Sequence, residues 1–147
     1  MDRRTFIKGA FAATAVIASG SARASDYGSG DEKTIHRLTD RSNPSLLEQK
    51  HVPSINAPEV IEKDTWFDVK INVGYLQEHP SNPDHWITWI KLLANGKEIA
   101  KTEFPTGGIG APQAVFRIRL SSSSTLEAVE HCNIHGTWIS DKVEVRV

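Results

Sequence analysis

The 147-residue sequence has a single cysteine, almost no surplus of charge and no apolar run of membrane-spanning length. One cysteine, Cys132, excludes an intramolecular disulfide and any second metal centre built from four thiolates. A formal net charge of -1 provides no basic field for nucleic acid. With 39% hydrophobic and 24% charged residues, the composition indicates one globular domain and no repeat array or membrane bundle.

The first 24 residues have the pattern of an export signal. Arg3 and Arg4 stand in Asp-Arg-Arg-Thr-Phe-Ile-Lys, which resembles a twin-arginine signal. The uncharged run Gly9–Gly20 is shorter than the roughly 20 residues of a membrane span. Ala22 and Ala24 are small residues that predict cleavage after Ala24, and the alternatives are an uncleaved anchor or a disordered tail. We therefore expect a periplasmic protein, without stable membrane insertion after cleavage.

Cleavage would leave a mature chain with a formal charge of -4, because the segment contains four basic residues and one acidic residue. The twin-arginine route carries folded proteins, often with a cofactor already bound, which favours a metalloprotein. A lone thiol in an oxidising compartment is a liability unless it is buried or used. Metal ligation would explain Cys132, and the alternative is a buried cysteine that packs like a small apolar residue.

Residues 25–44 are polar and show no period, which predicts a flexible segment whose His36 is a solvated surface residue. Residues 67–73 alternate apolar and polar side chains with the period of two expected of a half-buried strand. The apolar run 86–93 is followed by Asn95-Gly96, a strong hairpin pattern, and then by a returning strand at 98–104.

Further alternation at 114–120 and 143–147 continues this pattern, and no segment forms a convincing amphipathic helix. The Gly-rich stretch 106–110 has no lysine and predicts a loop. Short strands broken by proline and glycine predict an all-β fold, an immunoglobulin-like antiparallel β-sandwich, over residues 45–147. We expect the four tryptophans to lie mostly in the core.

Five potential metal ligands fall in three clusters near the ends of predicted strands. These are His51, then His79 and His85 six residues apart, then Cys132 and His135 three apart. A β-sandwich gathers its loops at its ends, where side chains distant in sequence can converge. Each cluster alone is weak evidence, because a single Cys-x-x-His occurs by chance and a lone histidine is usually a solvated side chain.

Together, the clusters resemble those of the superoxide reductases, the desulfoferrodoxin and neelaredoxin family. The matching segments are Lys50-His51-Val52-Pro53, His79-Pro80 with His85, Trp89-Ile90, and Cys132-Asn133-Ile134-His135-Gly136 with Trp138. The resemblance covers about Glu48 to Val147. It implies one mononuclear iron, Fe²⁺/Fe³⁺, with four equatorial imidazoles and an axial thiolate. The implied ligands are His51, His79, His85, His135 and Cys132.

The resemblance also implies reduction of superoxide to hydrogen peroxide by one electron. A rubredoxin-like protein or a cytochrome would supply that electron, and the family's one-iron members are compatible with a homotetramer. Five ligands exceed the four that structural zinc prefers. Fe²⁺ with one thiolate and four neutral imidazoles would carry a charge of +1 and attract an anion. Lys50 adds a second positive charge and is the candidate catalytic residue, as a steering group.

Position 49 departs from the family pattern, and a neighbouring residue is a competing candidate for the role of the missing glutamate. The family has a glutamate before the Lys-His-Val-Pro motif, where it caps oxidised iron, and this sequence has Gln49 there. Glu48 is a competing cap, although an extended backbone would point it the other way. His131 adjoins Cys132, but on a strand the two would face opposite ways, so we expect His131 to be structural or on the surface.

Two other functions remain open at this point. One is a non-catalytic iron-binding or electron-transfer module on the same fold, which the absence of a glutamate at position 49 favours. The other is an immunoglobulin-like interaction domain, for which the five ligand-type residues would be a coincidence. Trp138 stands close to the Cys-x-x-His segment and is expected to wall the site.

Overall fold

The computed structural model describes residues 34–147, so the predicted export signal and residues 25–33 lie outside the described part of the chain. No helix within residues 34–147 is long and apolar enough to span a membrane. The cleavage site and the flexible character of residues 25–33 remain predictions.

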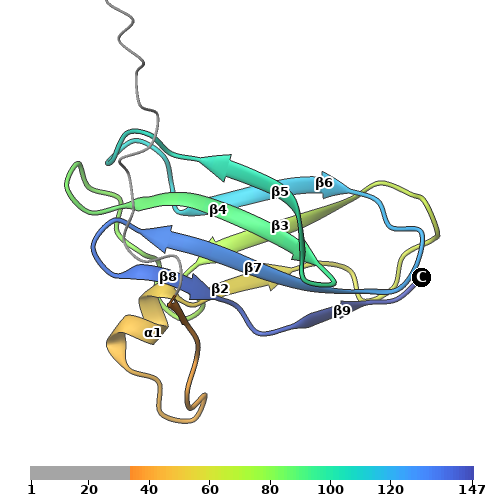
Figure 1. Ribbon diagram of the computed structural model, residues 1–147, viewed down its shortest axis with the longest axis horizontal. Helices are drawn as coiled ribbons and strands as arrows, with labels where there is room; N and C mark the ends of the chain where they lie inside the picture. Colours follow the sequence, from red (N-terminus) through yellow and green to blue (C-terminus); the bar gives the residue numbers. More distant parts are fainter. Residues whose placement is uncertain (1–33) are drawn as a thin grey trace, which may run out of the picture.

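Two β-sheets form the molecule, and their strands run along its long axis (Figure 1). In spatial order the larger sheet contains β1 (Ile35–His36), β8 (Gly136–Ile139), β7 (Ser124–Cys132), β4 (Ile87–Ala94) and β5 (Lys97–Glu103), with β9 (Val143–Val145) also paired to β7. The smaller sheet contains β2 (Pro53–Asn56), β3 (Phe67–Val73) and β6 (Gln113–Ile118). Every strand pair is antiparallel except β1 with β8, which confirms the predicted β-sandwich.

The core lies between the two sheets and follows the alternation of the sequence. Val69, Ile71 and Val73 of β3 are fully buried and belong to one cluster with Ile90 and Leu92 of β4. The polar side chains between them on β3 face away from this cluster. Burial of these apolar side chains supplies about 1.5–3 kcal/mol each.

The predicted hairpin at Asn95-Gly96 is confirmed. Asn95 has φ of 51° and Gly96 has φ of 78°, and two consecutive residues with positive φ are typical of the type I′ turn. Asn95 also holds β7, because its side-chain oxygen accepts a hydrogen bond from the amide of Thr125 at 3.0 Å. The turn therefore lies at the end of the sandwich opposite to Ile87 and Cys132.

Strand β7 shows no alternation in its sequence because both of its faces are covered. Leu126 and Ala128 point into the core, whereas Val129 packs with Trp89 in a second apolar cluster. Eight of its nine residues are buried. A strand buried on both sides cannot be recognised from a period of two.

The chain has one short helix, α1 (Leu46–His51), in a segment for which the sequence showed no convincing amphipathic pattern. The hydroxyl of Ser45 accepts a hydrogen bond from the Glu48 amide, and the Glu48 carboxylate accepts one from the Ser45 amide at 2.7 Å. This capping box satisfies the first free amides of the helix, and its Ser-x-x-Glu pattern was present in the sequence. Helix α1 places Lys50 and His51 in its last turn, at one end of the sandwich (Figure 1).

The loop after β3 is held against the end of α1. The Gln49 carbonyl accepts hydrogen bonds from the amides of Leu76 and Gln77, and the Val52 carbonyl accepts one from Tyr75 at 2.8 Å. Gly74 makes this approach possible, because a Cβ there would lie 2.4 Å from the carbonyl carbon of Lys50. The loop leads directly to His79, so this contact joins two of the candidate ligands.

We predict that Gly74→Ala destabilises the protein and weakens metal binding. The added methyl would collide with backbone atoms, which cannot move aside cheaply, so the loss of stability should be about 1–3 kcal/mol. Gly96→Ala is the matched control: it strains a positive φ at an open position, costs about 1 kcal/mol, and should leave metal affinity unchanged. Thermal unfolding and metal titration of both variants test this, and equal metal affinities would contradict it.

Candidate metal centre

All five ligand-type side chains selected from the sequence come together at one end of the sandwich. Each residue offers one nitrogen or sulfur atom, and these atoms all lie within 4.8 Å of one another. They arrive from separate elements: the end of α1, the loop between β3 and β4, the last residue of β7, and the turn before β8. They are His51, His79, His85, Cys132 and His135.

The four imidazole rings form a closed ring around a common centre. His51 contacts His79 with ring centroids 4.7 Å apart, and His79 contacts His85 at the same distance. His85 contacts His135 at 5.1 Å, and His135 returns to His51 at 4.8 Å. Each contact is edge-on, with interplanar angles of 67–81°. The geometry suits four imidazoles that each direct one nitrogen toward the same point.

Hydrogen bonds to the backbone fix two of these rings. Nδ1 of His51 lies 2.7 Å from the carbonyl oxygen of Leu47, and Nδ1 of His79 lies 2.7 Å from that of Pro80. A carbonyl can only accept, so each Nδ1 carries the proton and each Nε2 keeps its lone pair. The Nε2 atoms of His51, His79 and His85 are buried without a hydrogen-bond partner among the described residues. A bound cation would satisfy all three.

The sulfur of Cys132 faces the same centre. It accepts a hydrogen bond from the amide of His135 at 3.4 Å, and Nδ1 of His135 lies 3.7 Å away. Burial raises the pKa of the Cys132 thiol to about 11, and hydrogen bonds from the amides of His135 and Ile134 partly oppose this shift. A cation is therefore needed to hold the sulfur as a thiolate at neutral pH.

Burial also favours the neutral form of His51, His79 and His85. Desolvation lowers the pKa of His51 to about 4 and that of His79 to about 3, and it lowers the pKa of His85. Neutral imidazole is the form that binds a metal. Four imidazoles and one thiolate, with no carboxylate in the group, exceed the four ligands of structural zinc and suit iron. The donor set therefore fits one mononuclear iron.

Lys50 lies near the group. Its positive charge lowers the pKa of both His51 and His85, and none of the ion pairs within residues 34–147 includes it. The Lys50 ammonium therefore keeps its charge available to an approaching anion.

Gln49 and Glu48 are both held in structural contacts. The side-chain nitrogen of Gln49 donates to the Pro44 carbonyl, and its side-chain oxygen accepts from the side chain of Gln77 at 2.9 Å. Both Glu48 oxygens are engaged, and Thr39 donates two hydrogen bonds at 2.7 Å from its amide and hydroxyl. These bonds lower the Glu48 pKa to about 2. The competing expectation that Glu48 caps the metal is therefore not supported.

Trp138 forms a wall of the centre, as expected. Its ring stacks on His51 with centroids 5.1 Å apart, and its indole N–H donates to the His135 carbonyl at 3.0 Å. His36 of β1 is exposed, as predicted, and its ring lies 4.7 Å from the Trp138 ring. Part of the segment that was predicted to be flexible thus forms strand β1 and lies beside the site.

The remaining candidates lie elsewhere. His131 is buried outside the group, where its Nδ1 contacts the Thr137 hydroxyl at 2.9 Å and its ring stacks on Trp89. Trp66 is 56% exposed, which corrects its expected place in the core.

Glu130 is fully buried, and its carboxylate oxygens have no hydrogen-bond partner among the described residues. Burial raises the pKa of Glu130 well above its usual value.

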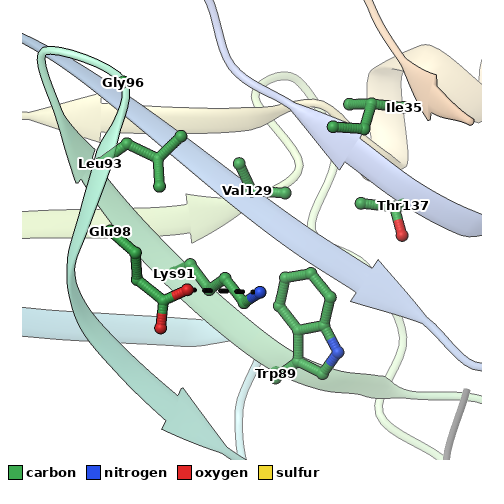
Figure 2. Close-up of a pocket in the computed structure, with 8 residues that line it drawn as sticks. All are labelled: Ile35, Trp89, Lys91, Leu93, Gly96, Glu98, Val129 and Thr137. Carbon is green, nitrogen blue, oxygen red and sulfur yellow. Dashed lines mark ion pairs between the residues drawn. The ribbon is translucent and has the colours of Figure 1, made fainter. Parts of the chain in front are cut away.

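A groove of about 330 Å³ lies on the outer face of the larger sheet, and Figure 2 shows its lining. Lys91 and Glu98 form an ion pair of 3.4 Å across it, and the Lys91 ammonium lies 4.5 Å from the ring centroid of Trp89. Ile35, Leu93 and Val129 supply apolar surface. None of the five clustered ligands lines the groove, so it is separate from the metal centre.

The sequence and structure match one known family. The family model of desulfoferrodoxin matches residues 44–141. The chain belongs to the desulfoferrodoxin family. Superoxide reductase of Thermococcus kodakarensis is 35% identical over 98 residues, covering 61% of this chain and 83% of that protein. Desulfoferrodoxin of Desulfarculus baarsii is 38% identical over 103 residues, covering 69% and 70%.

A solved structure agrees with this assignment. Superoxide reductase (neelaredoxin) from Ignicoccus hospitalis is 30% identical to this chain, with a TM-score of 0.65. The match covers 77% of this chain and 94% of that one. The shared sandwich accounts for nearly all of that relative, and this chain is longer.

We predict that Zn²⁺, used as a redox-inactive probe, displaces about one proton when it binds the metal-free protein at pH 8. The Cys132 thiol is protonated there because its pKa is about 11, whereas the His51 and His79 imidazoles, with pKa values of about 4 and about 3, are already neutral. The apparent affinity should rise about tenfold per pH unit below the thiol pKa. Calorimetry in buffers of different ionisation enthalpy measures the proton count. Binding without proton release would show that the sulfur is not a ligand.

Proposed function

We propose that this protein is a superoxide reductase, which converts superoxide to hydrogen peroxide at one iron bound by His51, His79, His85, His135 and Cys132. The observation that carries the proposal is the convergence of four imidazoles and one thiol, with no carboxylate, on one point. Membership of a family whose relatives are named superoxide reductase supports it.

The chemistry that a bound iron would supply is the transfer of one electron. Superoxide, one electron and two protons give hydrogen peroxide, so an external donor must return one electron for each superoxide consumed. Cys132, the only cysteine, is in the site, which leaves no thiolate for a second iron centre in this chain. A small rubredoxin-like protein or a cytochrome is the class of donor that fits this need.

The protein's own residues prepare the site for an anion. Desolvation favours the neutral form of His51, His79 and His85, and neutral ligands do not cancel the charge of a bound cation. The amides of Ile134 and His135 face the sulfur and moderate its donor strength. Burial of His51 and His79 to 1% exposure excludes water from one side of the centre.

The whole reaction can be tested by anaerobic mixing of the reduced, iron-loaded protein with superoxide. The proposal expects one hydrogen peroxide for each iron oxidised, without release of dioxygen. One hydrogen peroxide and one dioxygen for every two superoxides, without net oxidation of the iron, would indicate dismutation. Ferrous iron that superoxide does not oxidise, in a protein whose ferric form still accepts electrons from a donor, would favour the electron-transfer module that Gln49 kept open.

Lys50 is proposed to steer superoxide to the site. We predict that Lys50→Ala keeps its iron but reacts more slowly, by up to about tenfold at low ionic strength, because a positive charge near the entrance is lost. The wild-type rate should fall as salt is added, because salt screens the attraction. Stopped-flow kinetics at several salt concentrations measures both effects.

Lys97→Ala provides the control for this experiment. Lys97 is exposed at the hairpin of β4 and β5, at the other end of the sandwich, so its removal changes the net charge equally. Equal rates for Lys50→Ala and Lys97→Ala would show that net charge, and not the position of Lys50, determines the rate.

Gln49 is proposed to leave oxidised iron open to added anions, because no carboxylate stands in its place. We predict that Gln49→Glu shifts the ferric absorption band and weakens azide binding. If the new carboxylate closed the site about nine-tenths of the time, the apparent azide affinity would fall about tenfold. Superoxide reduction should persist in this variant.

Glu48→Gln is the matched control for Gln49→Glu. The carboxylate of Glu48 is used by Thr39 and Ser45, so its replacement should leave the ferric spectrum unchanged while lowering the stability of α1. A spectral change in Glu48→Gln, with none in Gln49→Glu, would assign the cap to Glu48.

The cellular location and the assembly of the protein are also part of the proposal. The pair Arg3-Arg4 and the apolar run that follows support export by the twin-arginine route to the periplasm. A homotetramer is the proposed assembly, from the family resemblance. Fractionation of cells that express the full chain, and sedimentation of the purified protein, test these two points.

A further inference from the structure

We propose that Asn133 is a positioning residue that holds His85 in the metal centre. The inference rests on the proposed function only in requiring that the centre binds a metal. Asn133 lies in the turn between Cys132 and His135, and its polar groups bond to the two residues on either side of His85.

Three hydrogen bonds join Asn133 to the residues on either side of His85. The side-chain oxygen of Asn133 accepts from the amide of Trp86 at 2.9 Å, and its side-chain nitrogen donates to the Asp84 carbonyl at 2.8 Å. The backbone amide of Asn133 donates to the Trp86 carbonyl at 3.2 Å. The segment that carries His85 is thus tied, before and after the histidine, to the turn that carries two other ligands.

His85 needs such support more than His51 and His79 do. Carbonyl groups fix the rings of His51 and His79 through their Nδ1 atoms, whereas none within residues 34–147 accepts a hydrogen bond from the ring of His85. The regular pairing of β4 with β7 also ends at Ile87 and Cys132, before His85 is reached. The side chain of Asn133 continues this pairing for two residues by imitating a backbone amide.

Other contacts hold the remainder of the loop. The Ser81 hydroxyl donates to the Gly110 carbonyl at 2.7 Å, and Gly107 packs closely against Asn82 and the Trp86 ring. These contacts join the loop to the Gly-rich segment 106–110. Only the Asn133 bonds, among those of the described chain that flank His85, connect it to the Cys132–His135 turn.

The effect of Asn133 on global stability should be small. Asn133 is exposed, and an ordinary hydrogen bond contributes about 0.5–1.5 kcal/mol. Its effect on metal binding should be larger, because residues that orient a ligand typically change metal affinity by about 10–100-fold. These two expectations separate a positioning role from a purely structural one.

The test compares Co²⁺ binding to the wild type, Asn133→Ala, His85→Ala and the double variant. We expect Asn133→Ala to weaken binding by about 10–100-fold. Its visible spectrum should move toward the stronger absorption of four-coordinate Co²⁺, as in His85→Ala. In the His85→Ala background, Asn133→Ala should alter the Co²⁺ affinity by less than about twofold, because the histidine that Asn133 positions is no longer present.

Additive losses in the double variant, or wild-type affinity and spectrum in Asn133→Ala, would overturn the inference. Asn95→Ala is the control: it removes two side-chain hydrogen bonds at the far end of β4 and should lower the melting temperature without changing the Co²⁺ spectrum. If Asn133→Ala does not fold, Asn133→Asp serves in the same cycle, since it keeps the acceptor for Trp86 and loses the donor to Asp84.

These measurements do not use superoxide. A protein that binds Co²⁺ through His85 and shows the expected coupling, yet fails to reduce superoxide with iron bound, would retain the Asn133 inference and refute the proposed function. The opposite combination, superoxide reduction with additive losses, would refute only the role of Asn133.

Discussion

At one end of the sandwich, three imidazole nitrogens are removed from water and given no hydrogen-bond partner. Leaving a buried polar atom unpaired costs about 1–3 kcal/mol, so the Nε2 atoms of His51, His79 and His85 together oppose folding by several kcal/mol. The sulfur of Cys132 is buried beside them with a raised pKa. A cation that binds all of these atoms would remove the cost, which is why the folded scaffold and the metal site depend on each other.

The surrounding structure orients the imidazoles so that their nitrogens point at one place. Helix α1 brings the Leu47 carbonyl to Nδ1 of His51, and the loop after β3 brings the Pro80 carbonyl to Nδ1 of His79. Trp138 supports the ring of His51 from the side. The capping box of Ser45 and Glu48 contributes indirectly, because it fixes the helix that carries His51. Each support comes from a backbone carbonyl or a side chain outside the group of five candidate ligands.

The sequence predicted the local features well and the long-range ones only through the family pattern. The alternation of β3 and the Asn95-Gly96 hairpin depend on neighbouring residues, and both were confirmed. Strand β7 was not recognised because burial on both faces removes its period, and α1 was overlooked although its capping box was present. The bonds of Asn133 join residues 47–49 positions apart, and no local pattern reveals such contacts.

The central claim is that four imidazoles and one thiolate of this chain bind a single iron. X-ray absorption at the iron K-edge of the reduced, iron-loaded protein tests it most directly, because nitrogen and sulfur neighbours scatter differently. The account predicts one sulfur neighbour together with imidazole nitrogens from four histidines, and the loss of the sulfur contribution in Cys132→Ser. An iron surrounded by oxygen and nitrogen alone, or a spectrum that Cys132→Ser leaves unchanged, would contradict it.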